Sequence, residues 1–257
     1  MAGAAKEISV FGCGAIGVVG GYMGGVGDFE RDILELVERV CCSLGESLRE
    51  PLLKVAEKLI SLHGRGLVKI NHSVMEVVCA AHLIRLGYVV DVERYLGDNL
   101  VCDVYGERKG GGHIIEVETG FAPPENALDP QRYLMARVVS KAARYSRFSD
   151  KFSLATPRYN ILEIPEPLVK PPRSRTVEEI RHLKSLCDAY YSRPPVQEGE
   201  VREARIHSVI ILSVDDLTMV ELPPETYYGE IVKQVLGKGS WGSRCLSGRP
   251  RMDVLDP

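Results

Sequence analysis

Apolar residues recur at helical spacing early in the chain and alternate with polar residues further on. From residue 28 to residue 62 the pattern predicts two amphipathic helices, separated by a break at Gly45. The next stretch predicts a helix, three strands, a helix and a strand. Their expected ranges are Asn71–Leu86, Tyr88–Tyr95, Leu100–Tyr105, His113–Thr119, Pro130–Phe148 and Lys151–Thr156.

Proline and glycine interrupt the second half of the chain. After a Pro-rich passage, Thr176 and Glu179 occupy the capping-box positions of a short helix, Val177–Tyr191. The apolar run Ile206–Val214 is typical of a buried strand, and a last helix is expected near the end. The predicted organisation is a glycine-rich leader (1–27), an N-terminal helical region (28–66), an α/β domain (67–236) with a Pro-rich insertion (157–205), a last helix (226–236) and a flexible tail (237–257).

The composition is that of a globular protein. The 257 residues are 45% hydrophobic and 26% charged, which excludes disorder as the dominant state and allows one large domain or two small ones. We expect no membrane span, because no run of about 18 apolar residues is free of breakers. Seven cysteines without zinc-site spacing fit reduced thiols, so a cytoplasmic location is expected.

The leader contains a formal G-x-G-x-x-G motif behind the strand-like residues 8–11. Its glycines are Gly12, Gly14 and Gly17. Such a motif binds a dinucleotide only where a helix follows at once, and no good helix begins before Asp28. A glycine-rich leader is therefore the favoured interpretation. An NAD(P)-dependent oxidoreductase remains an alternative, and no cofactor-binding residues are assigned.

Three acidic residues interrupt apolar strands in the middle of the chain. Asp103 lies within LVCDVYG, and Glu116 and Glu118 lie within HIIEVETG. Side chains alternate across a strand, so Ile114, Glu116 and Glu118 are expected on one face. Ionised carboxylates are rarely buried unless they are paired or bound to metal. They therefore predict a site for a divalent cation, or else a wet sheet face or ion pairs with a neighbouring helix.

These residues and their order resemble the PD-(D/E)XK nuclease superfamily, over residues 71–156. The resemblance implies a restriction-endonuclease-like α/β core around a central mixed sheet flanked by helices, and Mg²⁺-dependent (or Mn²⁺-dependent) cleavage of phosphodiester bonds. It also implies that Asp103 and Glu116 are catalytic metal ligands. Glu76 matches an acid from the first core helix, and Gln131 matches a polar residue early in the second helix. A capping box with Ser73 is the alternative explanation of Glu76.

This chain departs from the family pattern at Glu118, where a lysine is usual. That lysine helps to position the attacking water and offsets developing negative charge. Some family members move it to the following helix. Tyr133, Arg137, Lys141 and Arg144 form one helical stripe there. Lys141 is the candidate for the migrated lysine, with a solvated helix face as the alternative. Glu118 would then bind metal or act as a base.

Positive charge gathers locally although the formal net charge is −3. From residue 131 to residue 184 there are twelve Lys and Arg residues against five acidic ones. Phosphate backbones are bound mainly through such an excess. The expected nucleic-acid contacts are Gln131, Arg137, Lys141 and Arg144. The candidates for stacking on unpaired bases are Tyr133, Tyr145, Phe148 and Tyr159, of which two or more are expected in the core.

The sequence therefore predicts a metal-dependent nuclease that acts on nucleic acid, DNA in the first instance. The N-terminal helices would cap the core or form the face of a homodimer. The alternative from another class is a catalytically inactive relative that keeps the fold as a nucleic-acid-binding module. The absence of the strand lysine favours this alternative.

Overall fold

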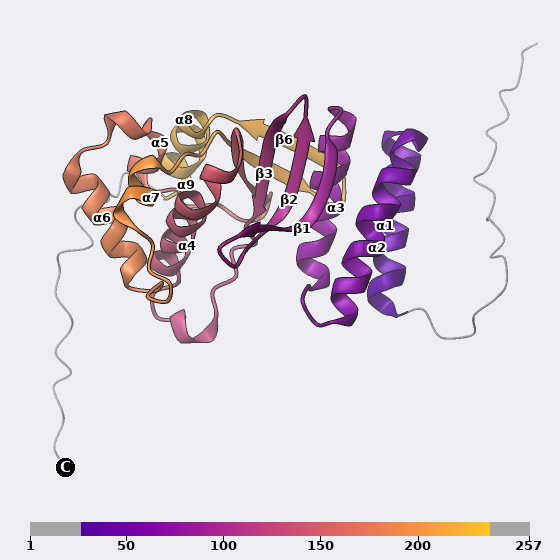
Figure 1. Ribbon diagram of the computed structural model, residues 1–257, viewed down its shortest axis with the longest axis horizontal. Coiled ribbons are helices and arrows are strands. Elements are labelled where there is room, and N and C mark those ends of the chain that lie inside the picture. Colours follow the sequence, from indigo (N-terminus) through magenta and orange to yellow (C-terminus); the bar gives the residue numbers. More distant parts are fainter. Residues whose placement is uncertain (1–26, 237–257) are drawn as a thin grey trace, which may run out of the picture.

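The computed structural model describes residues 27–236, and these fold around one mixed sheet (Figure 1). The strand order is β1-β2-β3-β4-β5-β6. The strands are β1 (Val89–Gly97), β2 (Leu100–Arg108), β3 (Gly111–Val117), β4 (Lys151–Pro157), β5 (Ser208–Ser213) and β6 (Thr218–Leu222). β4 is parallel to both of its neighbours, and every other pair is antiparallel. The predicted α/β architecture is confirmed, although the edge strand β6 was not predicted.

Helices cover both faces of the sheet. On one face lie α1 (Asp28–Leu44), α2 (Arg49–Gly64) and α3 (Ile70–Arg85), which form the expected N-terminal pair and the first core helix. On the other face lie α4 (Pro130–Tyr145), α5 (Glu166–Val169), α6 (Val177–Asp188), α7 (Glu198–Glu203) and α8 (Pro224–Tyr227). A π-helical turn (Tyr228–Val232) joins α8 to α9 (Lys233–Leu236). Figure 1 shows α3 against the sheet, with α1 and α2 stacked outside it.

Local signals in the sequence account for several of these boundaries. α1 ends at Gly45, whose φ of 126° is in the region that favours glycine. The capping box of Thr176 and Glu179 is present at the start of α6, as predicted. Within residues 27–236, no helix is both long enough and apolar enough to cross a membrane. The predicted leader, its three motif glycines and the predicted tail lie outside the described residues.

The hydrophobic core is divided by the sheet, and the division follows the alternation along β3. Ile115 and Val117 pack with α1, α2 and α3, whereas Ile114 packs with the cluster around α4. This confirms the predicted alternation and places Glu116 on the α4 side of the sheet. β3, β4 and β5 are parallel, so their carboxyl ends meet at one edge of the sheet, next to the first turns of α3.

Candidate metal centre and lysine cluster

A distortion in the β1–β2 hairpin brings two acidic residues to this edge. Glu93 and Asp103 lie opposite each other, between the pairs Val92–Val104 and Arg94–Cys102, but they are not paired themselves. Glu93 has a φ of 46°, in the left-handed region, which is rare for a residue that is not glycine. The distortion also breaks the alternation of side chains along β2. Val104 packs on the α3 side of the sheet, whereas Cys102, two residues earlier, packs on the α4 side. Strain of this kind often accompanies a functional site.

Four potential metal ligands converge at the distortion. They are His72 and Glu76 from α3, Glu93 from β1 and Asp103 from β2, and one ligand atom of each lies within 4.8 Å of the others. Imidazole nitrogen and carboxylate oxygen are common ligands of divalent cations in proteins. This group, termed the metal-candidate group here, could therefore hold a metal ion. It contains two of the predicted ligands, Asp103 and Glu76, but not Glu116.

Glu76 does not form the capping box that was considered for it. α3 begins at Ile70, so Ser73 lies inside the helix, and its hydroxyl group has no hydrogen-bond partner in the described residues. Glu76 is instead fully buried, and its Oε1 lies 2.7 Å from His72 Nδ1. Its Oε2 has no hydrogen-bond partner among these residues either. An unsatisfied buried carboxylate oxygen beside other ligands fits a cation site.

The electrostatics of the metal-candidate group indicate that protons and cations compete for it. Burial, followed by the charges of Glu76 and Asp103, raises the pKa of Glu93 to about 8. Burial also raises the pKa of Glu76. For His72, burial lowers the pKa, but the hydrogen bond to Glu76 and the charge of Asp103 outweigh it and raise the pKa to about 9. Glu93 and His72 thus retain protons near neutral pH, and a divalent cation would replace these protons.

Asp103 and Glu116 join β2 and β3 where the two strands separate. Their regular pairing ends at Val104 opposite Ile115. Beyond that point the backbone N–H of Val117 donates to Asp103 Oδ2 at 2.6 Å, and the N–H of Asp103 donates to Glu116 Oε1 at 3.2 Å. The two carboxyl groups therefore replace the missing backbone contacts. Burial and the charge of Asp103 raise the pKa of Glu116 to about 8.

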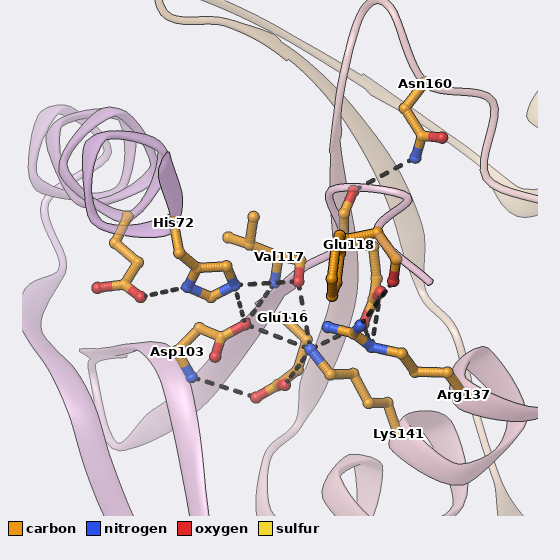
Figure 2. A network of polar contacts seen from close by, with 10 residues as sticks. His72, Asp103, Glu116, Val117, Glu118, Arg137, Lys141 and Asn160 are labelled. Atoms are coloured by element: carbon orange, nitrogen blue, oxygen red, sulfur yellow. Dashed lines mark hydrogen bonds and ion pairs between the residues drawn. The ribbon is translucent and has the colours of Figure 1, made fainter. Parts of the chain in front are cut away.

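Lys141 from α4 lies at the centre of the three strand carboxylates (Figure 2). Its Nζ is 2.8 Å from Glu118 Oε1, 3.0 Å from Glu116 Oε2 and 3.5 Å from Asp103 Oδ2. It also donates to the carbonyl oxygen of Val117 at 3.2 Å. Burial lowers the pKa of Lys141, but the three carboxylates raise it well above its usual value. Asp103, Glu116, Glu118 and Lys141 are termed the lysine cluster here. Burial of the three acids overturns the wet-face alternative, whereas the ion pairs confirm the other alternative, pairing with the neighbouring helix.

The other predicted site residues of α4 lie in three different environments. Arg137 joins the lysine cluster, since its Nε is 3.1 Å from Glu118 Oε2. Gln131 is exposed and lines a small pocket together with Glu118 and Asn160. Arg144 lies away from the cluster, because its guanidinium donates to the carbonyl oxygen of Pro194 at 2.5 Å. The residues predicted to form one stripe along this helix therefore do not share one environment. Of that stripe, Arg137 and Lys141 reach the acidic residues.

A cavity of about 930 Å³ opens beside the metal-candidate group. His72 and Glu93 of the metal-candidate group line it, as does Arg137, which is paired with Glu118 of the lysine cluster. The rest of the lining comes from the first turns of α3 and from the segments that follow β3, β4 and β5. Ligand sites in sheets with parallel strands often lie at this carboxyl edge.

The positive charge of residues 131–184 is mostly paired. Ion pairs join Arg137 to Glu118, Arg147 to Asp98, Lys151 to Glu221, Arg158 to Asp216, Lys170 to Glu179 and Lys184 to Asp188. Arg175 is buried and donates to backbone carbonyl groups. The excess of positive charge in this part of the sequence is therefore largely neutralised in the folded structure by neighbouring acidic residues. The cations that line the cavity are Lys69, Arg137 and Arg158.

Two members of the metal-candidate group were not predicted. His72 precedes Glu76 by four residues on one helix, which is a spacing that brings side chains together and could have identified it. Glu93 lies within a regular alternation of polar and apolar residues, and no signal in the sequence marks its distortion.

Comparisons of the chain with models of protein families, with curated proteins and with solved structures find no match.

Proposed function

We propose that the protein is a metal-dependent nuclease that hydrolyses phosphodiester bonds, with DNA as the first expected substrate. The observation that carries the proposal is that the metal-candidate group and the lysine cluster share Asp103, and that His72, Glu93 and Arg137 connect them to one cavity. Phosphodiester cleavage needs a divalent cation, positive charge near the phosphate and space for the substrate. The residues around this cavity supply candidates for all three.

The residues that would hold the cation are His72, Glu76, Glu93 and Asp103. The orphaned Oε2 of Glu76 and the mixed imidazole and carboxylate donors fit such an ion. Mg²⁺ takes mainly oxygen ligands, so the imidazole favours Mn²⁺ over Mg²⁺. When bound, the ion supplies Lewis acidity and lowers the pKa of water.

The chain's own residues would bind and orient the phosphate. Arg137 lines the cavity, and its guanidinium is held by Glu118 and by the carbonyl oxygen of Phe121 at 3.4 Å. It is therefore a fixed positive charge that a phosphate group can reach. Lys141 would neutralise Glu116 and Glu118, which leaves Asp103 to the metal-candidate group. Glu116 would position Asp103 through the backbone N–H of that residue.

One observation favours the second candidate, a catalytically inactive module that binds nucleic acid. The ammonium group of Lys141 contacts oxygen atoms of Asp103, Glu116 and Glu118, and also the carbonyl oxygen of Val117. A cation already lies among the oxygens of the predicted active-site acids. In an inactive relative this lysine would replace the metal ion permanently, and the fold would keep its structure without catalysis.

The deciding experiment is a cleavage assay with end-labelled single-stranded, duplex and branched DNA and matching RNA, in Mg²⁺, Mn²⁺ or EDTA. We expect metal-dependent cleavage that falls more than about 100-fold in Asp103→Ala and in Glu116→Ala. The matched control is Glu107→Ala, an exposed acidic residue of β2 for which we expect unchanged activity.

Two results would contradict the nuclease. Salt-sensitive binding without cleavage in any metal would identify the inactive module, because phosphate contacts depend on salt. Cleavage that persists in both alanine variants would come from another site or from a contaminating enzyme. Each variant is checked for folding by circular dichroism before its activity is measured.

A further inference from the structure

Two aromatic side chains are exposed at the rim of the cavity. Phe121 is 65% exposed and follows β3, and Tyr159 is 78% exposed and follows β4. Both line the cavity together with His72 and Glu93 of the metal-candidate group. In the described part of the chain, neither ring stacks on another aromatic ring or on a cation. Exposed aromatic rings gathered at one cavity are typical of binding sites.

The structure distinguishes Tyr159 from the other aromatic residues that were expected to stack on bases. Tyr133 packs edge-on against Tyr190, with 5.5 Å between ring centroids. Tyr145 and Phe148 are partly buried against the core on the α4 side. Tyr159 alone of the four lines the cavity. Phe121 was not predicted and adds a second ring to the same rim.

A close contact between two loops supports both rings. Gly120 has a φ of 77°, and a Cβ atom added there would lie 2.3 Å from Asn160 Oδ1. The Asn160 amide donates to Thr156 Oγ1 at 2.8 Å. It also donates to the carbonyl oxygen of Glu118 at 3.4 Å, a contact that Figure 2 shows. Phe121 and Tyr159 are the direct neighbours of Gly120 and Asn160. The two rings are thus held on loops that are fixed to each other, which reduces the entropy lost on binding.

The charge around the rings fits a nucleotide chain. Lys69, Arg137 and Arg158 line the cavity from three different segments, as do the acidic residues Glu93 and Asp215. Arg137 and Arg158 are paired with Glu118 and Asp216. Lys69 is exposed and forms no ion pair in the described residues, so it is available to a phosphate group. A cavity of about 930 Å³ can accept a nucleotide and its flanking phosphates. Apolar rings beside cations are the combination that single-stranded nucleic acids require.

We infer that Phe121 and Tyr159 bind an unpaired base, so that the protein selects single-stranded segments or unpaired ends over intact duplex. The inference rests on the proposed function, because it names the substrate class of that site. A base inside a duplex is stacked on both sides and cannot offer its faces to the two rings. An unpaired base can stack on them while its flanking phosphates meet Lys69, Arg137 and Arg158.

The test uses a single-stranded DNA oligonucleotide that contains 2-aminopurine, and the same sequence as a duplex. Binding is measured by fluorescence quenching and by anisotropy in EDTA, so that no cleavage occurs. The variants are Phe121→Ala and Tyr159→Ala. Phe121→Tyr and Tyr159→Phe retain the rings and control for the fold of the loops. Tyr95→Ala removes an exposed aromatic residue of β1 that does not line the cavity.

We expect each alanine variant to bind the single strand about 5- to 150-fold more weakly and to lose the quenching. Duplex binding should change by less than about twofold, since it does not use the stacking contact. The ring-retaining variants and Tyr95→Ala should behave as the wild type. Equal affinity for the single strand in all five variants would overturn the inference. A wild type that binds duplex as tightly as the single strand would also overturn it.

Failure of this inference can be distinguished from failure of the proposed function. If the wild type cleaves DNA in Mn²⁺ but the alanine variants keep full affinity and quenching, the nuclease stands and the base-binding site is wrong. If no substrate is cleaved but quenching depends on the two rings, the base-binding site stands on an inactive module.

Discussion

Two buried polar networks lie on the same central strands, and they differ in charge and in access. One joins His113, Ser153 and Ser208 across β3, β4 and β5, and is termed the serine network here. Its hydrogen bonds are 2.8 Å from His113 Nε2 to Ser153 Oγ and 2.6 Å from Ser153 Oγ to Ser208 Oγ. The other is the lysine cluster with the metal-candidate group, at the carboxyl ends of the same parallel strands.

The serine network is neutral and enclosed. Burial lowers the pKa of His113 to about 4, so the imidazole carries no charge at neutral pH. All three residues are at least 95% buried, and none of them lines the cavity. A histidine beside two serines invites a catalytic interpretation, but here no substrate can reach them. Such a network stabilises the pairing of the strands.

The second network is charged, and three of its residues, His72, Glu93 and Arg137, line the cavity. Its five carboxyl groups are those of Glu76, Glu93, Asp103, Glu116 and Glu118. Among residues 27–236 they face two permanent cations, Lys141 and Arg137, with His72 as a third positive group. Burial raises the pKa values of Glu93 and Glu116, and the charges of neighbouring carboxylates raise them further. The comparison of the two networks shows that burial of polar groups does not by itself indicate function. An excess of one charge beside a cavity is the more informative feature.

The largest effect is expected from Lys141→Met. This change leaves the buried carboxylates of the lysine cluster without their cation, so the free energy of unfolding in EDTA should fall by about 3–5 kcal/mol. Excess Mn²⁺ should restore part of the loss, because it binds only the folded state. Urea denaturation in both conditions measures this.

The control for this substitution is Lys54→Met, which removes an exposed lysine paired with Glu50 on α2. An i,i+4 pair on the surface contributes little, so we expect a change below about 0.5 kcal/mol. A similar loss in both variants would mean that Lys141 is not essential to the charged network.

The serine network should make the protein sensitive to acid. The pKa of His113 in the folded state is about 4, below the ordinary 6.5, so the unfolded chain takes up its proton first as the pH falls. The stabilisation is complete above pH 6.5 and is lost as the pH falls towards about 4. We expect a loss of about 2–3 kcal/mol from this residue.

Comparison with His113→Gln isolates this residue from other titrating groups. His207, whose Nδ1 accepts a hydrogen bond from the backbone N–H of Phe152 at 3.0 Å, also has a pKa lowered by burial. The difference in urea stability between wild type and variant should therefore shrink from pH 7.5 to pH 4.5. A difference that stays constant over this range would show that His113 does not titrate on unfolding as described.

The metal-candidate group should respond to Glu93→Gln with a weaker affinity for Mn²⁺. Loss of one carboxylate ligand should raise the Kd for Mn²⁺ by about 10- to 100-fold, as measured by isothermal titration calorimetry. Stability in EDTA should not fall, because the amide also removes a crowded carboxyl group. Glu107→Gln on the exposed part of β2 is the control. An unchanged Kd would exclude Glu93 from the metal site.

The sequence predicted most of the fold because hydrophobic periodicity follows burial closely in α1–α4 and in β2–β5. It also predicted that Asp103, Glu116 and Glu118 lie near each other, since strand alternation determines the faces. Lys141 was expected beside these acids and Arg137 on the same stripe of α4, because residues four apart share a helix face; the pairing of Arg137 with Glu118 was not predicted.

The errors arose where distant contacts override local patterns. The capping box at Ser73 was wrong because α3 begins at Ile70, which places Ser73 inside the first turn rather than at the N-cap. Arg144 was expected with Lys141, but it bonds to the segment before α7, which sequence spacing does not place. The position of Glu93 depends on its left-handed backbone, and its alternating strand pattern hides that distortion.

The smallest effect is expected from Ser153→Ala, which removes the centre of the serine network. His113 and Ser208 would each lose a hydrogen bond in the core, so the free energy of unfolding should fall by about 1–2 kcal/mol. Because this network does not line the cavity, the affinity for Mn²⁺ and any cleavage activity should stay at the wild-type level. A fall in metal affinity alongside the loss of stability would show that the two ends of the strands are coupled, and the distinction between a structural and a functional network would then fail.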